Sequence, residues 1–126
     1  MEGFKSSVKF CTRELTGKEK VSIKDTTIPT RIDNLLKTVD DYLDIAIDYF
    51  AVLDVHNERT ENKDYEIYVI VDKDGNRYMT GSPSFYSALA DIYEEMKEVD
   101  EDWGIRVYRR DSKTYSGKTF ITCSVI

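Results

Sequence analysis

The chain has 126 residues and a formal net charge of −6, with 40% hydrophobic and 33% charged side chains. This size predicts one domain with its own core, and nine tyrosines and five phenylalanines argue against an intrinsically disordered chain. No apolar run approaches the roughly 20 residues that span a bilayer, and the first residues lack the apolar core of a signal peptide.

The charge is distributed unevenly along the chain. Residues 1–40 carry a net charge of +2, residues 41–102 one of −12, and residues 103–126 one of +4. The acidic total argues against coating of duplex DNA by bulk charge, but it allows a local basic groove. We therefore expect a single domain, residues 1–126, with an N-terminal basic arm (1–40) and a core (41–126).

The first 40 residues show weak periodicity. Residues 7–10 (SVKF) and 19–25 (EKVSIKD) alternate briefly and are predicted as short strands. Residues 31–39 (RIDNLLKTV) have apolar residues at helical spacing and predict one or two helical turns. The basic residues of this segment are a second candidate for contact with a DNA strand or a neighbouring subunit, although a solvated leading strand is the plainer interpretation. They are Lys5, Lys9, Arg13, Lys18, Lys20 and Lys24.

From Tyr42 the apolar period changes to two. Leu43, Ile45 and Ile47 begin an alternation that continues to Val55, which predicts a strand so long that it must bend or bulge to serve two sheets. Residues 66–71 predict a second strand, DKDGN a tight turn, and residues 77–80 (RYMT) a third strand.

Ser82 and Pro83 are typical of a helix start, as N-cap and first helical residue. One apolar stripe then follows at helical spacing: Phe85, Leu89, Ile92 and Met96. Residues 104–110 and 118–126 predict two final strands, joined by the loop DSKTYSG. The predicted fold is therefore mainly β: an OB-fold-like, five-stranded antiparallel barrel with its helix between the third and fourth strands, and an extra N-terminal strand or arm.

The last hairpin carries the main functional signal. Strand alternation sends Ile105 and Val107 to one face, and Arg106, Tyr108 and Arg110 to the other. Cations bind phosphates and exposed rings stack on bases, so this pattern predicts binding of a single nucleic-acid strand. The candidate residues are Arg106, Tyr108, Arg110, Lys113, Tyr115 and Lys118, with Trp103 at the entrance and Tyr68, Arg77 and Tyr78 as an extension on the second and third strands. The plainer interpretation is a set of solvated strand positions, with Trp103 packed under the helix.

Three stretches together resemble the small single-stranded-DNA-binding proteins encoded by phages and mobile elements of Gram-positive bacteria. They are VKFCTRELTGKEKVSIKDTT, AVLDVHNERTENKDYEIYVIVDKDGNRYMTGSPSF and VYRRDSKTYSGKTFITCS. The resemblance implies an OB-like core, DNA-strand binding without sequence preference, and a role in replication or recombination. Bacterial single-strand binders usually end in a flexible acidic tail, whereas this chain ends in the apolar SVI, which puts tail-mediated recruitment in doubt.

The expected partners follow from this function. Single-strand binders often assemble so that several grooves act together, so we expect a homo-oligomer. RNA binding and contacts with replication or recombination proteins stay open. Cys11 and Cys123 have no metal spacing and make no disulfide framework, so we expect reduced thiols in a cytoplasmic protein, in the host cytoplasm if a phage encodes it.

Catalytic and metal chemistry have little support. Asp72, Asp74 and Gly75 do not match the spacing of an EF-hand calcium loop. His56 is the single histidine, which disfavours a His-rich metal site or a Ser-His-Asp triad. Neither a P-loop nor a dinucleotide-binding motif occurs. We predict a non-enzyme without catalytic residues, metal or cofactor.

The runner-up hypothesis is a small acidic phage protein that imitates the charge of DNA and inhibits a host protein. Its exposed acids would be Asp44, Asp48, Asp91, Glu94, Glu95 and Glu98. A third hypothesis, an oligomeric structural component, depends on exposed strand edges at the two ends of the chain.

Overall fold

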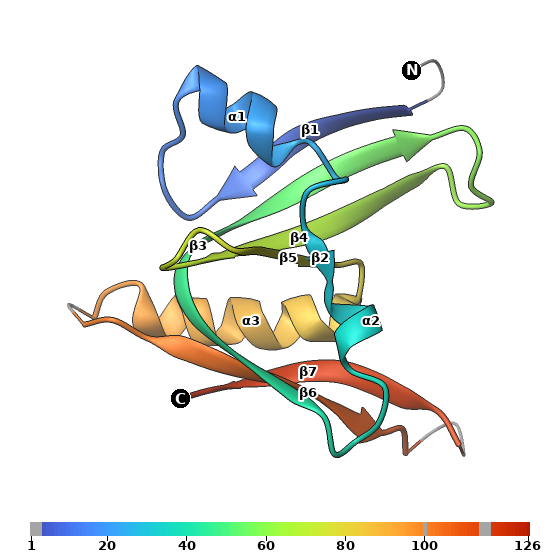
Figure 1. Cartoon of the computed structure of the whole chain (residues 1–126), viewed down its shortest axis with the longest axis vertical. Helices are drawn as coiled ribbons and strands as arrows, with labels where there is room; N and C mark the ends of the chain where they lie inside the picture. The colour runs from blue at the N-terminus through green and yellow to red at the C-terminus, as the bar shows by residue number, and fades with distance from the viewer. Residues whose placement is uncertain (1–3, 100, 114–116) are drawn as a thin grey trace. The chain divides into compact units, whose positions relative to one another are not determined.

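The computed structural model describes residues 4–99, 101–113 and 117–126. The described part is mainly β, with seven strands and three helices (Figure 1). The strands are β1 (Phe4–Cys11), β2 (Thr30–Arg31), β3 (Tyr42–Asn57), β4 (Asp64–Asp72), β5 (Arg77–Thr80), β6 (Gly104–Asp111) and β7 (Thr119–Val125). The helices are α1 (Gly17–Ile23), α2 (Ile32–Leu35) and α3 (Pro83–Met96). Among the described residues, no helix combines the length and the apolar character needed to cross a bilayer.

The chain forms two compact units. Unit 1 comprises Met1–Thr30 and Asp48–Gly81, and unit 2 comprises Arg31–Ile47 and Ser82–Ile126. The long strand β3 contributes to both, because residues 42–46 pair with β6 and residues 51–57 pair with β1. This confirms the prediction of one long strand that serves two sets of partners. From residue 42 onward the elements also follow the predicted order of three strands, a helix and two strands.

Unit 1 is built on antiparallel strands. β1 pairs with β3, and β4 pairs with β5 and lies next to β3. Alternation along β3 and β4 sends one set of side chains into a common core with helix α1. The core residues are Leu15, Ile23, Tyr49, Ala51, Leu53, Val55, Ile67, Val69, Val71 and Met79.

The prediction of a strand over residues 19–25 is wrong, because residues 17–23 form helix α1. Thr16 is its N-cap: the Thr16 hydroxyl accepts from the Glu19 N–H at 3.2 Å, and the Glu19 carboxylate accepts from the Thr16 N–H at 3.0 Å. This capping box satisfies two donors at the helix start. The short alternation of Val21 and Ile23 was the weaker signal, since Ile23 is buried in the core and Val21 stays exposed.

Two other local predictions are confirmed. One helical turn, α2, lies within residues 31–39. The turn between β4 and β5 has Gly75 at φ +88°, and the Asp72 carboxylate accepts from the backbone N–H groups of Asp74 and Asn76 at 2.9 and 2.8 Å. Asp72 therefore shapes a hairpin, as its position before an Asp-Gly pair predicted.

Unit 2 places helix α3 against a small antiparallel sheet. The first part of β3 pairs with β6, β6 pairs with β7, and α3 contacts β7 (Figure 1). As predicted, Ser82 caps α3 by accepting from the Phe85 N–H at 3.3 Å. The Ser84 hydroxyl donates to the Ile121 carbonyl at 2.8 Å and thus ties the first turn of α3 to β7. The buried side chains of this unit include Phe85, Leu89, Ile105, Val107, Ile121 and Cys123.

Candidate nucleic-acid interface

The two faces of β6 differ as the alternation predicted. Ile105 and Val107 are fully buried, whereas Arg106 and Arg110 are exposed and Tyr108 is half-buried. The exposed face is therefore the one that carries the basic and aromatic side chains.

Register adds neighbours to this face from β3 and β7. Tyr42 lies opposite Tyr108, and Phe120 lies opposite Arg110, one step diagonally from Tyr108. Side chains opposite each other on antiparallel strands have Cβ atoms roughly 5 Å apart, and diagonal neighbours about 7–8 Å. Tyr42 is 60% exposed and Phe120 37% exposed, so rings from three adjacent strands share one accessible surface. We call this surface the Tyr108 face; it carries Tyr42, Asp44, Arg106, Tyr108, Arg110 and Phe120.

Sequence reasoning did not place three members on the Tyr108 face, and it named Asp44 only as an exposed acid of the runner-up hypothesis. Tyr42 and Asp44 alternate with Leu43 and Ile45, and Phe120 precedes the buried Ile121. The alternation that places each of them on the outer side of its strand was readable. What was missing was the pairing of β3 with β6, which sets them beside the predicted residues.

At the β3 side of the face, Arg106 is held by two neighbours. Its Nε and Nη2 donate to the two carboxylate oxygens of Asp44 at 2.7 and 2.9 Å, and its guanidinium lies 4.3 Å from the centre of the Tyr42 ring. The Arg106 hydrogen bonds lower the pKa of the Asp44 carboxyl, and those same bonds raise the pKa of Arg106. Arg106 is thus locally neutralised rather than free to meet a phosphate.

At the centre of the face, Tyr108 is held by its hydroxyl. The Tyr108 Oη lies 2.7 Å from the Ser124 Oγ and accepts from Arg110 Nη2 at 3.3 Å. The Arg110 guanidinium also lies 5.4 Å from the centre of the Tyr108 ring. These contacts orient the ring without any acidic partner.

The β6–β7 end of the face is basic. Lys113 and Lys118 are exposed. Lys118 and Phe120 line a hollow of about 520 Å³ together with Ser112 and Thr119. Within the described residues, no carboxylate pairs with Arg110, Lys113 or Lys118. Tyr115, the remaining candidate of this loop, lies outside the described residues.

The other predicted residues do not join this cluster. Trp103 is half-buried at the start of β6, where its carbonyl accepts from the Ile47 N–H at 3.3 Å. It directly precedes β6, whereas Lys113 follows that strand, ten positions later, which is roughly 33 Å for fully extended chain at 3.3 Å per residue. Tyr68, Arg77 and Tyr78 belong to unit 1.

Two of these unit 1 residues are engaged in the packing of their own unit. Tyr68 is only 5% exposed, which leaves its ring no open face for stacking on a base. Arg77 donates to the carbonyl and the hydroxyl of Ser22 at 3.0 and 2.9 Å. Tyr78 is half-buried.

The N-terminal cations are partly neutralised. Lys9 pairs with Glu66 at 2.5 Å, and Arg13 pairs with Glu19 at 2.6 Å. β1, which carries Lys5 and Lys9, pairs with β3 of the same chain.

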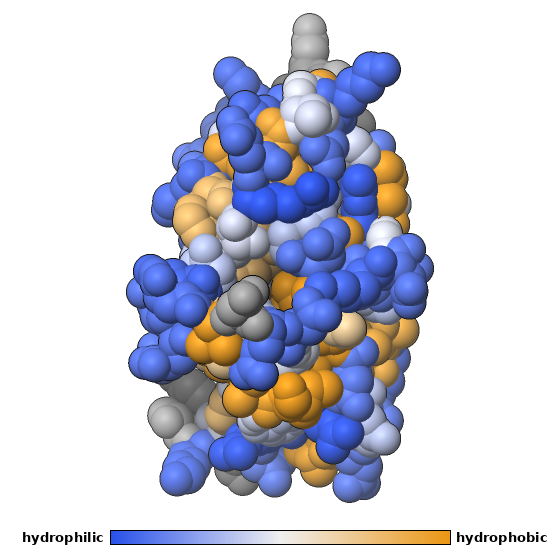
Figure 2. All heavy atoms as spheres, turned by 90° about the vertical axis from the view of Figure 1, so that its left-hand side faces the viewer, coloured by the Kyte–Doolittle hydropathy of each residue, from blue (hydrophilic) through white to orange (hydrophobic). Residues whose placement is uncertain are grey.

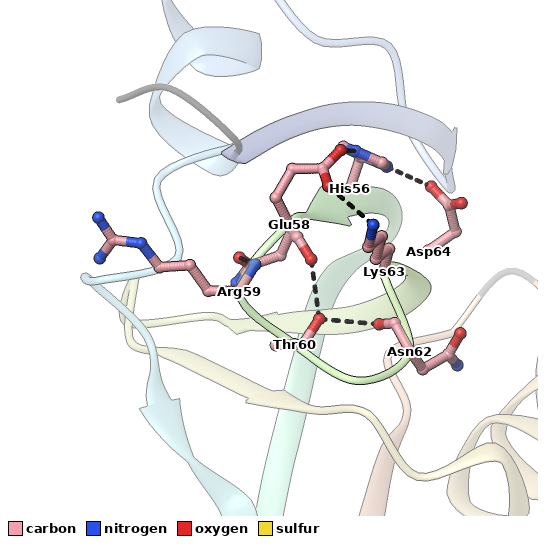
Figure 3. Close-up of polar contacts among 8 residues, drawn as sticks. His56, Glu58, Arg59, Thr60, Asn62, Lys63 and Asp64 are labelled. Atoms are coloured by element: carbon pink, nitrogen blue, oxygen red, sulfur yellow. Dashed lines mark hydrogen bonds and ion pairs between the residues drawn. The ribbon is translucent and has the colours of Figure 1, made fainter.

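The end of β3, the start of β4 and the loop between them carry a charged cluster around His56 (Figure 3). His56 Nδ1 lies 2.7 Å from Asp64 Oδ1, its Nε2 lies 2.6 Å from Glu58 Oε1, and Lys63 Nζ lies 3.1 Å from Glu58 Oε2. The hydrogen bond to Asp64, followed by that to Glu58, raises the pKa of His56. In Figure 3 the Arg59 side chain points away from this cluster.

The acids of helix α3, Asp91, Glu94 and Glu95, are exposed, as expected, and so is Glu98 directly after the helix. Three of them, Asp91, Glu94 and Glu95, line a hollow of about 360 Å³ with Ile92, Met96 and Val125.

On the side of the molecule seen in Figure 2, hydrophobic residues gather in small clusters between hydrophilic ones. In the described parts of the chain, His, Cys, Asp and Glu side chains form no group of three suited to a metal ion.

Comparisons with protein-family models, with curated proteins and with solved structures found no match to this chain.

Proposed function

We propose that the protein binds single-stranded nucleic acid, DNA in the first place, on the Tyr108 face and without reading sequence. The observation that carries this proposal is the set of three accessible rings on adjacent strands, Tyr42, Tyr108 and Phe120, next to cations without acidic partners in the described residues. Rings accept any base by stacking, and cations bind phosphates by releasing counterions. An open sheet face of this kind fits a single strand better than a duplex, whose bases are already stacked.

The proposed fold is an OB-like arrangement. Three features support it: the element order from β3 to β7, the pairing of β3 with both β4 and β6, and the pairing of β6 with β7. In OB-folds the loop between the first two strands and the loop between the last two contact the ligand. Here the loop between the last two strands carries Lys113 and Lys118.

The biological setting belongs to the same proposal. The resemblance to phage and mobile-element single-strand binders supports a role in DNA replication or recombination, in the host cytoplasm, by a non-enzymatic homo-oligomer. The charge pattern supports a local contact, because the net charge of −6 would repel DNA from most of the surface.

The test is a titration with a fluorescent, unstructured DNA oligonucleotide of about 30 nucleotides, several times the site of one OB-fold. A matched duplex and the RNA equivalent serve as competitors, and salt is varied. We expect salt-dependent binding that prefers the single strand. The double variant R110E/K118E should bind more weakly, and its logarithmic salt dependence should flatten by about 1.4, or 0.7 for each lost phosphate contact.

The control variant K73E/K97E changes the net charge by the same amount at exposed positions in the β4–β5 turn and directly after α3. It should bind like the parent. Equal losses in both double variants would show that bulk charge, and not the Tyr108 face, carries the affinity. No binding at low salt would refute the proposed function.

A second candidate function is inhibition of a basic host protein. The exposed row of acids on α3, beside a partly apolar hollow, favours it. Such a protein should capture a basic enzyme from lysate in a salt-sensitive manner and ignore oligonucleotides. Loss of capture in the variant E94Q/E95Q would support this alternative, and unchanged capture would contradict it.

A further inference from the structure

The ion pair between Asp44 and Arg106 sits inside the Tyr108 face, where it opposes the charge that a nucleic-acid strand would seek. Asp44 faces Arg106 directly in the β3–β6 register and binds it through both carboxylate oxygens. The bidentate geometry matches that in which a guanidinium binds a phosphate, so Asp44 occupies one of the donor pairs that a phosphate would use.

The rest of the face has no such competitor. Among the described residues, Arg110 donates a hydrogen bond to the Tyr108 hydroxyl and lies over the Tyr108 ring, and no carboxylate pairs with it. Lys113 and Lys118 are exposed at the same end of β6 and β7. The face is therefore electrostatically asymmetric along β6: Arg106 is neutralised by Asp44, whereas Arg110 and Lys118 have no acidic partner among the described residues.

We propose that Asp44 acts as a built-in competitor for phosphate, which withholds Arg106 from the strand and directs the phosphate backbone to the Arg110, Lys113 and Lys118 end of the face. This inference rests on the proposed function and concerns its regulation. Bases then lie over Tyr42, Tyr108 and Phe120, while phosphates follow the β6–β7 end.

The ion pair between Asp44 and Arg106 is weak enough to break and re-form. The side chains of Arg106 and Asp44 are 46% and 40% exposed, and half-exposed ion pairs are weak because water and salt screen them. Asp44 therefore lowers the affinity of the face without abolishing it. Removal of the Asp44 charge should release Arg106, which then provides one further contact to a phosphate.

The test compares the parent with the variant D44N in oligonucleotide titrations at several salt concentrations. Asparagine keeps the shape but removes the charge. We expect D44N to bind more tightly at low salt, with a logarithmic salt slope steeper by about 0.7, which is the value for one phosphate on a single strand. Between 50 and 200 mM salt, the advantage of D44N over the parent should shrink about 2.6-fold, as that slope requires.

Two further variants separate the causes. D91N makes the same change of charge on the exposed side of α3 and should leave both affinity and slope at the parental values. In D44N/R106Q the gain should disappear, because the released arginine is gone. A gain that survives in D44N/R106Q would show general relief of repulsion and overturn the competitor role.

The outcomes also separate this inference from the proposed function. Binding by the parent with no change in D44N refutes the competitor role alone. Binding by D44N and none by the parent would contradict the proposed function of the parent and a competitor that lowers the affinity without abolishing it. No binding by the parent, D44N or D91N refutes both the function and the inference.

Discussion

A Cβ atom on Gly104 would lie 2.7 Å from the carbonyl oxygen of Ile45 and 3.4 Å from the Cα of Ala46. Gly104 lies opposite Ala46 in the register of β3 with β6, so the two backbones approach more closely there than a side chain permits. This close approach begins the pairing that places Tyr42 and Asp44 beside Tyr108 and Arg106.

We therefore expect Gly104→Ala to lower the free energy of unfolding by about 1–3 kcal/mol, the usual cost of forcing extra atoms into a packed site. Denaturant unfolding followed by circular dichroism measures it. Gly81→Ala is the control, because its Cβ would meet only the Glu66 carbonyl oxygen at 3.7 Å, an ordinary contact. Equal stability of the two variants would contradict the close-approach argument.

The central ring of the Tyr108 face offers a clean test of stacking. Tyr108→Ala should weaken binding of a single strand by roughly 5- to 150-fold, which corresponds to about 1–3 kcal/mol per stacked base. Tyr108→Phe keeps the ring and removes the hydroxyl that contacts Ser124, so it should stay close to the parent. Fluorescence anisotropy measures both. If Tyr108→Phe weakens binding as much as Tyr108→Ala, the hydroxyl and not the ring carries the contact, and the stacking hypothesis is wrong.

His56 should titrate above its ordinary pKa of 6.5, because hydrogen bonds to Asp64 and Glu58 stabilise its charged form. As the single histidine of the chain, it gives an unambiguous NMR titration. Asp64→Asn should lower the pKa of His56 more than Glu58→Gln does, since Asp64 is the larger cause. A titration at or below 6.5 in the parent would contradict the contacts shown in Figure 3.

The same shift gives a direction for stability against pH. The pKa of His56 is raised in the folded chain, so its contribution is fully present below about 6.5 and is lost as pH rises through the folded value. Backbone hydrogen exchange at the C-terminal end of β3 and the N-terminal end of β4 should therefore be slower at pH 6 than at pH 8, after correction for intrinsic rates. His56→Gln should remove this difference.

The two thiols should differ in reactivity. Burial raises the pKa of Cys123 to about 12, whereas Cys11 is only half-buried. In the variant Cys11→Ser, a thiol reagent at pH 8 should therefore modify Cys123 only when the protein unfolds, because the thiolate is the reacting form. Rapid labelling of native Cys11→Ser would contradict the buried position. Cys123→Ser is the matched variant that reports Cys11 alone.

The local signals of the sequence were sufficient for most elements. The period-two run from Tyr42, the Asp72–Gly75 turn and the Ser82–Pro83 helix start all predicted what the structure contains, because each depends on contacts within a few residues. At residues 19–25 the local signals were misinterpreted, and a strand was predicted where the structure has helix α1. There the capping box of Thr16 and Glu19 outweighs two alternating apolar residues.

Composition of the candidate site was readable, but its arrangement was not. The sequence by itself determined that Arg106, Tyr108 and Arg110 share the outer side of a strand, since alternation follows from backbone geometry. Only the tertiary structure decided that Asp44 neutralises Arg106, that Tyr42 and Phe120 complete the aromatic surface, and that Tyr68 is buried. These depend on which strands pair and in which register, and pairing between residues some 60 positions apart leaves no local trace in the sequence.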